Sequence, residues 1–248
     1  MNQSFYIGAI GAHAQQQRLN VQGDNIANVN TYGFKASSGR FASLIYENMT
    51  GINNAQLPAG TGAHVMMTST DFRSGAAATT GRPQDYMIEG DGFFALADLS
   101  TGEVTYTRNG AFSVAEYQRP TDQVDENGQP VYETVLCLSD GQGRFVLNNQ
   151  GGLIEVTDPA EAQPVGIFDY SNYDGMLHTD GTRFLPVDKN GGLWLGEGKL
   201  LQGVLEMTNV DLAEEMTKVI ESQRAYGLAL KMVQTSDEVE TTINNLRG

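Results

Sequence analysis

The sequence predicts a mainly β, hairpin-rich middle domain, sandwich- or barrel-like, with α-helical arms at both ends that form a coiled-coil-like layer on assembly. Three observations predict this fold. In both terminal segments apolar residues recur at alternating spacings of three and four, which places them on one helix face. Between these segments the apolar pattern changes to period two, the period of strands. Asn-Gly and Asp-Gly pairs, which suit tight hairpin turns, recur through the middle of the chain.

The N-terminal arm and an Asn-rich turn occupy residues 1–35. Residues 1–30 contain no proline, and a narrow seam runs along one predicted helix face at Ile7, Ile10, Ala14, Gln17 and Val21. Because the seam is narrow and contains a glutamine, an isolated helix buries too little apolar surface to be stable alone. We therefore expect this helix to need a partner.

The C-terminal arm occupies residues 201–248 and gives the longer helical pattern. Its seam continues the alternation of four and three at Leu212, Met216, Val219, Gln223, Tyr226, Leu230 and Val233. After Val233 the phase slips, as a stutter allows, and the seam passes to Val239, Ile243 and Leu246. Asn209 or Asp211 is expected to be the N-cap of this helix.

The middle of the chain predicts an extended linker over 36–75 and a β-rich domain over 76–200, with a loop at 53–62. Short period-two runs predict strands at Val104–Thr107, Val131–Val135 and Leu153–Val156. The expected turns are Asp91-Gly92, Asn109-Gly110, Asn127-Gly128, Asp140-Gly141, Asp174-Gly175, Asp180-Gly181 and Asn190-Gly191.

Composition narrows the range of partners. The 248 residues carry 15 basic and 30 acidic side chains, a net charge of −15, which repels nucleic acid and anionic lipid. No apolar run approaches the roughly 20 residues that span a bilayer, and residues 1–20 lack the pattern of a cleavable secretory signal. We expect neither nucleic-acid binding nor membrane insertion. The single cysteine, Cys137, lies in an apolar run and is expected to be buried.

No catalytic, metal or cofactor site is predicted. His13, His64 and His178 lie in three regions without other ligands at metal-binding spacing. The acidic stretch 122–128 does not match an EF-hand loop. Glu89 and Asp91 flank a turn, and no second catalytic group accompanies them. We therefore expect a protein that is not an enzyme and needs no cofactor.

Three stretches resemble the flagellar rod and hook family of basal-body proteins. The first runs from Arg18 to Lys35, the second comprises 80–94 and 106–112, and the third comprises 202–216 and 221–226. The usual family form has Asn in place of Asp24 and a small residue or proline in place of Tyr32. The residues that carry the resemblance are Asn25, Ala27, Asn28, Asn30, Thr31, Gly33, Phe34, Lys35, Gly90, Asp91, Gly92, Phe93, Phe94, Arg108, Asn109, Gly110, Asn209, Val210, Gln223, Arg224, Ala225 and Tyr226.

The resemblance implies a structural rod subunit that is exported by the flagellar type III apparatus without a cleaved signal. It implies a tubular homo-oligomer in the basal body, with the terminal helices inside and the β domain outside. The implied partners are other rod and hook proteins, the export apparatus and ring proteins around the rod. The run Thr70-Asp71-Phe72 near Ser74-Gly75 favours the distal-rod type, whereas Thr80-Gly81-Arg82-Pro83 and the length also fit the proximal rod. A hook subunit is the less favoured alternative.

The arms suggest folding on assembly. We expect them to be poorly ordered in the monomer and to form a helical layer when docked on neighbouring copies. The predicted assembly interface is Ile7, Ile10, Ala14, Val21, Met216, Val219, Ile220, Gln223, Tyr226, Leu230 and Val233. The alternative from another class is an adhesin-like or carbohydrate-binding β module with a coiled-coil arm. In that case Trp194, Tyr170 and Tyr173 would form a binding platform.

Overall fold

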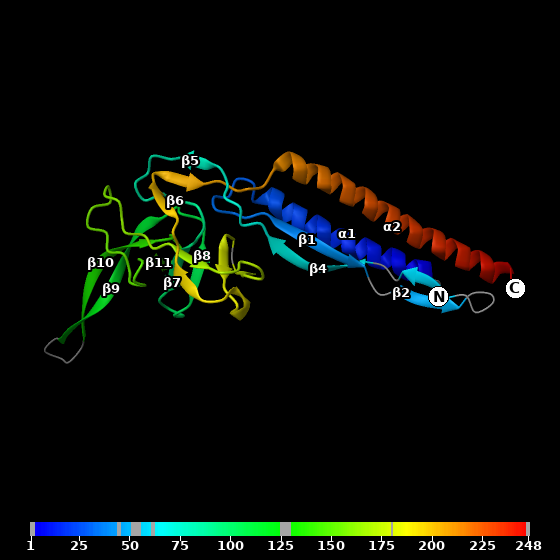
Figure 1. Cartoon of the computed structure of the whole chain (residues 1–248), viewed down its shortest axis with the longest axis horizontal. Coiled ribbons are helices and arrows are strands. Elements are labelled where there is room, and N and C mark those ends of the chain that lie inside the picture. The colour runs from blue at the N-terminus through cyan, green and yellow to red at the C-terminus, as the bar shows by residue number, and fades with distance from the viewer. Residues whose placement is uncertain are drawn as a thin grey trace. The chain divides into compact units, whose positions relative to one another are not determined.

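The computed structural model describes residues 3–43, 46–50, 56–60, 63–124, 130–179 and 181–246 (Figure 1). The chain forms two compact units. The first, here called the helical unit, contains Met1–Val29, Ala36–Asp71 and Val210–Gly248. The second, the β unit, contains Asn30–Lys35 and Phe72–Asn209. The chain therefore passes between the units four times.

Two long helices make up most of the helical unit: α1 (Gln3–Ala27) and α2 (Leu212–Leu246). They run side by side and antiparallel, because the hydroxyl of Ser4 lies 2.9 Å from that of Ser236 while Gly11 lies opposite Ala229 (Figure 1). Asp211 caps α2, since its Oδ1 accepts hydrogen bonds from the backbone N–H groups of Ala213 and Glu214 at 2.9 and 3.2 Å. Between the two expected caps, the structure selects Asp211.

The segment 36–75, expected as an extended linker, is extended but paired. Strand β1 (Ser37–Ser43) pairs antiparallel with β4 (Ala63–Thr70), and β2 (Tyr46–Thr50) pairs with β3 (Gln56–Gly60). The loop expected at 53–62 therefore contains a strand, while its residues 53–55 and 61–62 lie outside the described part of the chain. This pairing was not visible in the sequence because β1 is rich in serine and lacks an apolar alternation.

The β unit is built on a seven-stranded antiparallel sheet in the order β13-β14-β8-β7-β11-β10-β9. Three further antiparallel pairs join β12 to β15, β16 to β6 and β17 to β5. A 3-10 turn, η2, spans Asp188–Asn190. The strands are β5 (Ala77–Thr79), β6 (Tyr86–Glu89), β7 (Phe94–Asp98), β8 (Val104–Thr107), β9 (Ser113–Val124), β10 (Pro130–Ser139), β11 (Arg144–Val146), β12 (Phe168–Tyr170), β13 (Leu177–His178), β14 (Arg183–Leu185), β15 (Leu193–Leu195), β16 (Lys199–Gln202) and β17 (Val204–Glu206).

Both faces of this sheet are covered by a hydrophobic core. Phe94 and Leu96 of β7 point into one cluster, and Phe93 and Ala95 point into the other. Successive residues of a strand face opposite sides, so one short run fills both cores. Phe93 and Phe94 are both fully buried. Cys137 is buried as well, and burial raises the pKa of its thiol.

The predicted strands and turns are partly correct. Val104–Thr107 is strand β8, and Val131–Val135 lies within β10. Leu153–Val156 is not a strand, because this run only forms isolated bridges to Leu147 and Cys137. The expected positive φ is found at Gly92, Gly141, Gly175, Gly181 and Gly191. Asn127, Gly128 and Asp180 lie outside the described residues.

Gly110 is a turn residue for another reason. Its φ is not positive, yet an added Cβ would lie 1.8 Å from the carbonyl oxygen of Tyr86. Glycine at this expected turn therefore serves close backbone approach and not a left-handed conformation.

Candidate assembly surface and its buried anchor

The Asn-rich turn in the first stretch of the resemblance ends α1. The chain then enters the β unit. Asn28 closes α1, because its backbone N–H and its side-chain amide both donate to the carbonyl oxygen of Asp24, at 3.1 and 3.0 Å. Gly33 then adopts a φ of 70° and donates its N–H to the carbonyl oxygen of Glu206 at 2.8 Å. A Cβ on Gly33 would lie 2.3 Å from the backbone nitrogen of Asn109. Only glycine therefore fits this contact.

A buried charge cluster, here called the anchor, consists of Lys35, Arg108 and Glu206. Lys35 Nζ lies 2.6 Å from Glu206 Oε1, and Arg108 Nη1 lies 3.5 Å from Glu206 Oε2. The side chains of Lys35 and Glu206 are fully buried, and that of Arg108 is 2% exposed. Each residue comes from a different one of the three stretches that carry the resemblance. The fold thus brings these distant stretches to one point.

Backbone groups add hydrogen bonds to the anchor, and among the described residues only Arg108 Nε of its side-chain nitrogens and oxygens has none. Lys35 Nζ donates to the carbonyl oxygen of Arg73 at 2.8 Å, and Glu206 Oε1 accepts from the N–H of Gly75 at 2.9 Å. Arg108 Nη2 donates to the carbonyl oxygen of Gly90 at 2.8 Å. Buried charges are tolerated only when they are paired and hydrogen-bonded in this way. The anchor therefore fixes the segments of the β unit that adjoin the passages between the units.

Sequence reasoning found Lys35 and Arg108 as signature residues but assigned no role to Glu206. The available signal was chemical, because two cations in stretches that enter the core need a carboxylate if they are buried. Sequence distance concealed the partner, since Glu206 is separated from Lys35 by 171 positions. Asn209, an expected cap, instead donates its side-chain amide to the carbonyl oxygen of Arg73 at 3.1 Å.

The predicted interface residues of α2 divide between two faces. Val219, Tyr226 and Val233 are half-buried, whereas Met216, Ile220, Gln223 and Leu230 are exposed. Met216 and Ile220 are 54% and 52% exposed. The predicted interface residues of α1 are less exposed. Ala14 is buried, and Ile7, Ile10 and Val21 are half-buried.

Small and polar residues account for this division. Ser222 and Ser236 of α2 are buried, and Gly8 of α1 lies against Ala229 and Val233. The two helices therefore approach each other closely at small residues. The spacing of apolar residues along the sequence does not reveal such positions. The larger apolar residues on the adjacent flank of α2 remain open to solvent within one chain.

The helix pair contains buried polar atoms without hydrogen-bond partners among the described residues. They are Gln15 Oε1, Gln22 Oε1, Glu215 Oε2 and Ser222 Oγ. Each unsatisfied buried group costs free energy, about 1–3 kcal/mol for a neutral one. The two helices of one chain therefore form an incompletely satisfied contact.

Three family models match the chain along its length. "Flagella basal body rod protein" matches residues 5–35, "Flagellar hook protein FlgE/F/G D1 domain" matches 87–167, and "Flagellar basal body rod FlgEFG protein C-terminal" matches 201–246. The flagellar basal-body rod protein FlgG of Buchnera aphidicola from Schizaphis graminum is 32% identical over 269 residues, which cover 98% of this chain and 99% of the relative. The chain belongs to the flagellar basal-body rod protein family.

Other members of the rod family show the same full-length similarity. FlgG of Bacillus subtilis is 31% identical over 289 residues, with complete coverage of both chains. FlgF of Rhizobium meliloti is 25% identical over 260 residues, covering 100% of this chain and 99% of the relative. The anchor lies in matched regions, because Lys35, Arg108 and Glu206 fall one in each family model.

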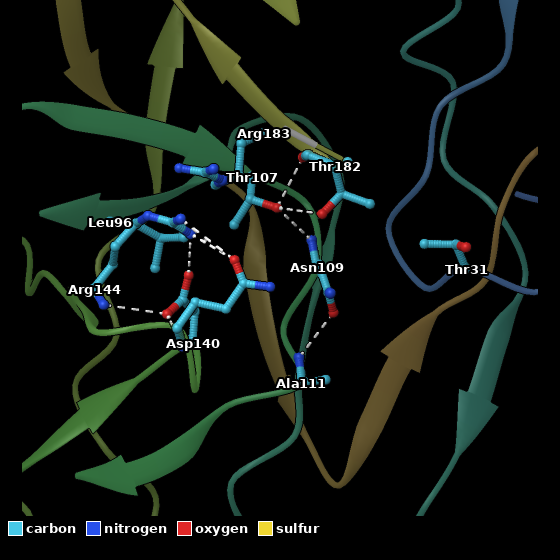
Figure 2. A pocket seen from close by; sticks show the side chains of 11 residues that line it. Thr31, Leu96, Thr107, Asn109, Ala111, Asp140, Arg144, Thr182 and Arg183 are labelled. Atoms are coloured by element: carbon cyan, nitrogen blue, oxygen red, sulfur yellow. Dashed lines mark hydrogen bonds and ion pairs between the residues drawn. The ribbon is translucent and has the colours of Figure 1, made fainter. Parts of the chain in front are cut away.

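A polar hollow of about 340 Å³ in the β unit of this rod-family chain holds side chains that bond to one another (Figure 2). The hydroxyl of Thr107 donates to the carbonyl oxygen of Thr182 and accepts from the N–H of Asn109, both at 3.0 Å. Asp140 Oδ2 pairs with Arg144 Nη1 at 2.7 Å. These contacts fix loops against the sheet, which is a structural role.

The remaining candidate residues lie apart. His13 lies on α1, His64 in β4 and His178 in β13, and no group of three or more potential metal ligands occurs among the described residues. The acidic stretch 122–128 begins in β9, and its residues 125–128 lie outside the described part. Neither α1 nor α2, as far as they are described, is long and apolar enough to cross a membrane.

Proposed function

We propose that this chain is a non-enzymatic structural subunit of the bacterial flagellar basal-body rod that polymerises into a tube. Support for the rod comes from full-length relatives named as rod proteins. Among the reported relatives, FlgG proteins reach 32% identity and FlgF 25%, which favours the FlgG type. We take this type as the distal rod, in agreement with the run Thr70-Asp71-Phe72.

The geometric observation that supports assembly is an apolar stripe on α2. The stripe consists of Leu212, Met216, Ile220 and Leu230, all exposed within one chain. Their spacings of four and ten residues place them on one flank of the helix, next to the face that packs on α1. An exposed apolar stripe of this kind marks a protein interaction surface.

A tube explains how the stripe is covered. A patch on one copy that contacts a different patch on the next copy forms a heterologous contact, and repeated contacts that do not close generate a helix. The net charge of −15 keeps the free subunit soluble before assembly. We propose that the stripe and the half-buried residues of α1 form the contacts between copies.

Ordering of the arms on assembly stays a prediction. It is supported by the four buried polar atoms of α1 and α2 that lack hydrogen-bond partners among the described residues, because a contact that is incomplete within one chain gains more from neighbouring copies. The further partners that we propose are other rod and hook proteins, the flagellar type III export apparatus and ring proteins around the rod. We place the protein in the flagellar basal body.

The alternatives are not favoured. The adhesin-like reading needs Trp194, Tyr170 and Tyr173 on one exposed platform, but Tyr170 is buried and Tyr173 packs against core residues. Hydrogen bonding to Asp169, together with the larger effect of burial, raises the pKa of the Tyr173 phenol. The hook reading is less well supported, because the reported full-length relatives are rod proteins.

The test places a charge within the stripe. Ile220→Asp should abolish incorporation into basal bodies, because a carboxylate would be buried between copies without a partner. Thr217→Asp adds the same charge to the same helix, at an exposed polar position outside the stripe, and should incorporate normally. Incorporation is measured by immunoblotting of purified basal bodies, with soluble expression of each variant as the folding control. Normal incorporation of Ile220→Asp would contradict the proposed interface.

A further inference from the structure

Strand β15 presents an unusual surface in the β unit. Its three residues, Leu193, Trp194 and Leu195, are 48%, 45% and 53% exposed. The strand pairs with β12 on one side, and its other edge has no strand partner among the described residues. An edge strand with exposed large apolar side chains is a template for pairing with another chain.

A hollow of about 400 Å³ adjoins this strand and contains Trp194 and four carboxylates, those of Glu89, Asp91, Asp169 and Glu197. None of these carboxylates forms an ion pair with a described residue. The nearest cation in strand register is Lys199, which lies opposite Glu89 in the pairing of β16 with β6. The hollow is therefore strongly negative next to an exposed indole.

The backbone holds these carboxylates in place. A Cβ on Gly198 would lie 2.8 Å from the carbonyl oxygen of Asp91, so the turns that carry Asp91 and Glu197 are in close contact. Asp169 Oδ1 accepts hydrogen bonds from the Tyr173 hydroxyl at 2.5 Å and the Tyr170 N–H at 2.7 Å. The negative charges are thus preorganised, and binding needs little ordering of this surface.

The anchor also supports this hollow. Arg108 Nη2 donates to the carbonyl oxygen of Gly90 at 2.8 Å, and Gly90 adopts a φ of 108°. The Gly90-Asp91-Gly92 run, which resembled a family signature, therefore shapes the wall of the hollow.

We propose that β15 and the adjoining hollow form a docking site for a cationic segment of a second protein. A basic side chain enters the hollow, where the carboxylates attract it and the indole face of Trp194 provides a cation–π contact. The apolar side chains of β15 and its free backbone edge bind the rest of an extended segment. A second copy of this chain is not the expected occupant, because the chain has twice as many acidic as basic residues and would be repelled by the carboxylates of the hollow.

The test uses Trp194 as the reporter, because it is the only tryptophan in the sequence. The full chain is titrated with the peptide acetyl-Arg-Val-Arg-Val-Arg-amide at low salt, and the tryptophan emission is recorded. We expect a saturable change that weakens as salt is added. The peptide acetyl-Glu-Val-Glu-Val-Glu-amide should produce none, because it meets carboxylates of the same sign. The inference does not depend on the rod assignment, and its failure leaves that assignment intact.

Matched variants separate this site from general attraction to an acidic protein. Glu89→Gln combined with Asp91→Asn should weaken binding of the basic peptide about tenfold. Glu116→Gln combined with Glu221→Gln removes the same charge at exposed positions elsewhere and should leave the affinity within about twofold. Equal losses in the two double variants, or no binding to the wild type, would overturn the proposal. Sedimentation that shows self-association lost only in the first variant would identify a second copy as the occupant and also overturn it.

Discussion

At the scale of single residues, a glycine can be required for two different reasons. Either the backbone adopts a positive φ, or neighbouring atoms leave no room for a Cβ. Gly33 and Gly81 have nearly identical φ angles of 70° and 71°. A Cβ on Gly33 would meet the backbone of Arg108 and Asn109, whereas a Cβ on Gly81 would have no atom within 4 Å. The two positions therefore share the strain of a left-handed conformation and differ in packing.

Replacing each glycine by alanine separates these two costs. Gly81→Ala should lower the free energy of unfolding by about 1–2 kcal/mol, the strain of a positive φ. Gly33→Ala should cost about 2 kcal/mol more, because backbone atoms must move to admit the methyl group. Urea unfolding followed by Trp194 fluorescence measures both. Equal losses would show that close approach at Gly33 carries no penalty.

The anchor makes a second prediction at this scale. Lys35→Met leaves the carboxylate of Glu206 buried with only the more distant Arg108 as an ionic partner, and should destabilise the β unit by about 3–5 kcal/mol. Lys199→Met, at an exposed position of β16, should change the free energy of unfolding by less than about 0.5 kcal/mol. The same urea unfolding experiment measures both variants.

A triple variant tests the cause of that loss. Because Arg108 also pairs with Glu206, Lys35→Met combined with Arg108→Met and Glu206→Leu removes every charge of the anchor. It should recover part of the stability, since replacing a whole buried charge cluster by apolar residues is often nearly neutral. A triple variant less stable than Lys35→Met alone would show that the backbone hydrogen bonds of the anchor contribute more than its charge balance.

At the scale of elements, the helices were predictable, and their packing was not. The spacing of apolar residues predicted helical arms, and α1 and α2 are the result. Contact between them uses Gly8, Ser222 and Ser236, which carry no apolar signal. Strands β1 and β4 were missed for a similar reason, because backbone pairing holds them and the alternation is weak.

Gly8 gives the prediction for the helix pair. A Cβ on Gly8 would lie 2.9 Å from Val233 Cγ2 and 3.3 Å from the carbonyl oxygen of Ala229. Gly8→Val should therefore push the helices apart and reduce incorporation into basal bodies. Gly23→Val raises helix propensity equally at a position with no atom within 4 Å, and should incorporate normally. Immunoblotting of purified basal bodies compares the two, and equal incorporation would argue against close helix contact.

At the scale of the whole molecule, the sequence predicted the order helix, β domain, helix, and the elements of the structure follow that order. The contact among Lys35, Arg108 and Glu206 could not be predicted. These residues are far apart in the sequence, and contacts between distant segments produce no local sequence pattern. The same holds for the hollow beside Trp194, whose carboxylates come from β6, β12, the turn after β6 and the connection between β15 and β16. Long-range sites of this kind become visible only in the folded chain.

The central claim is that the apolar stripe of α2 is open in the free subunit and covered in the assembled rod. Ile220→Cys tests it through maleimide labelling, with little background because Cys137 is buried and burial raises its thiol pKa. Gln118→Cys, at an exposed position of β9, serves as the accessible control. The account predicts rapid labelling of Ile220→Cys in dilute protein and protection in purified basal bodies. Equal labelling in both preparations would contradict it.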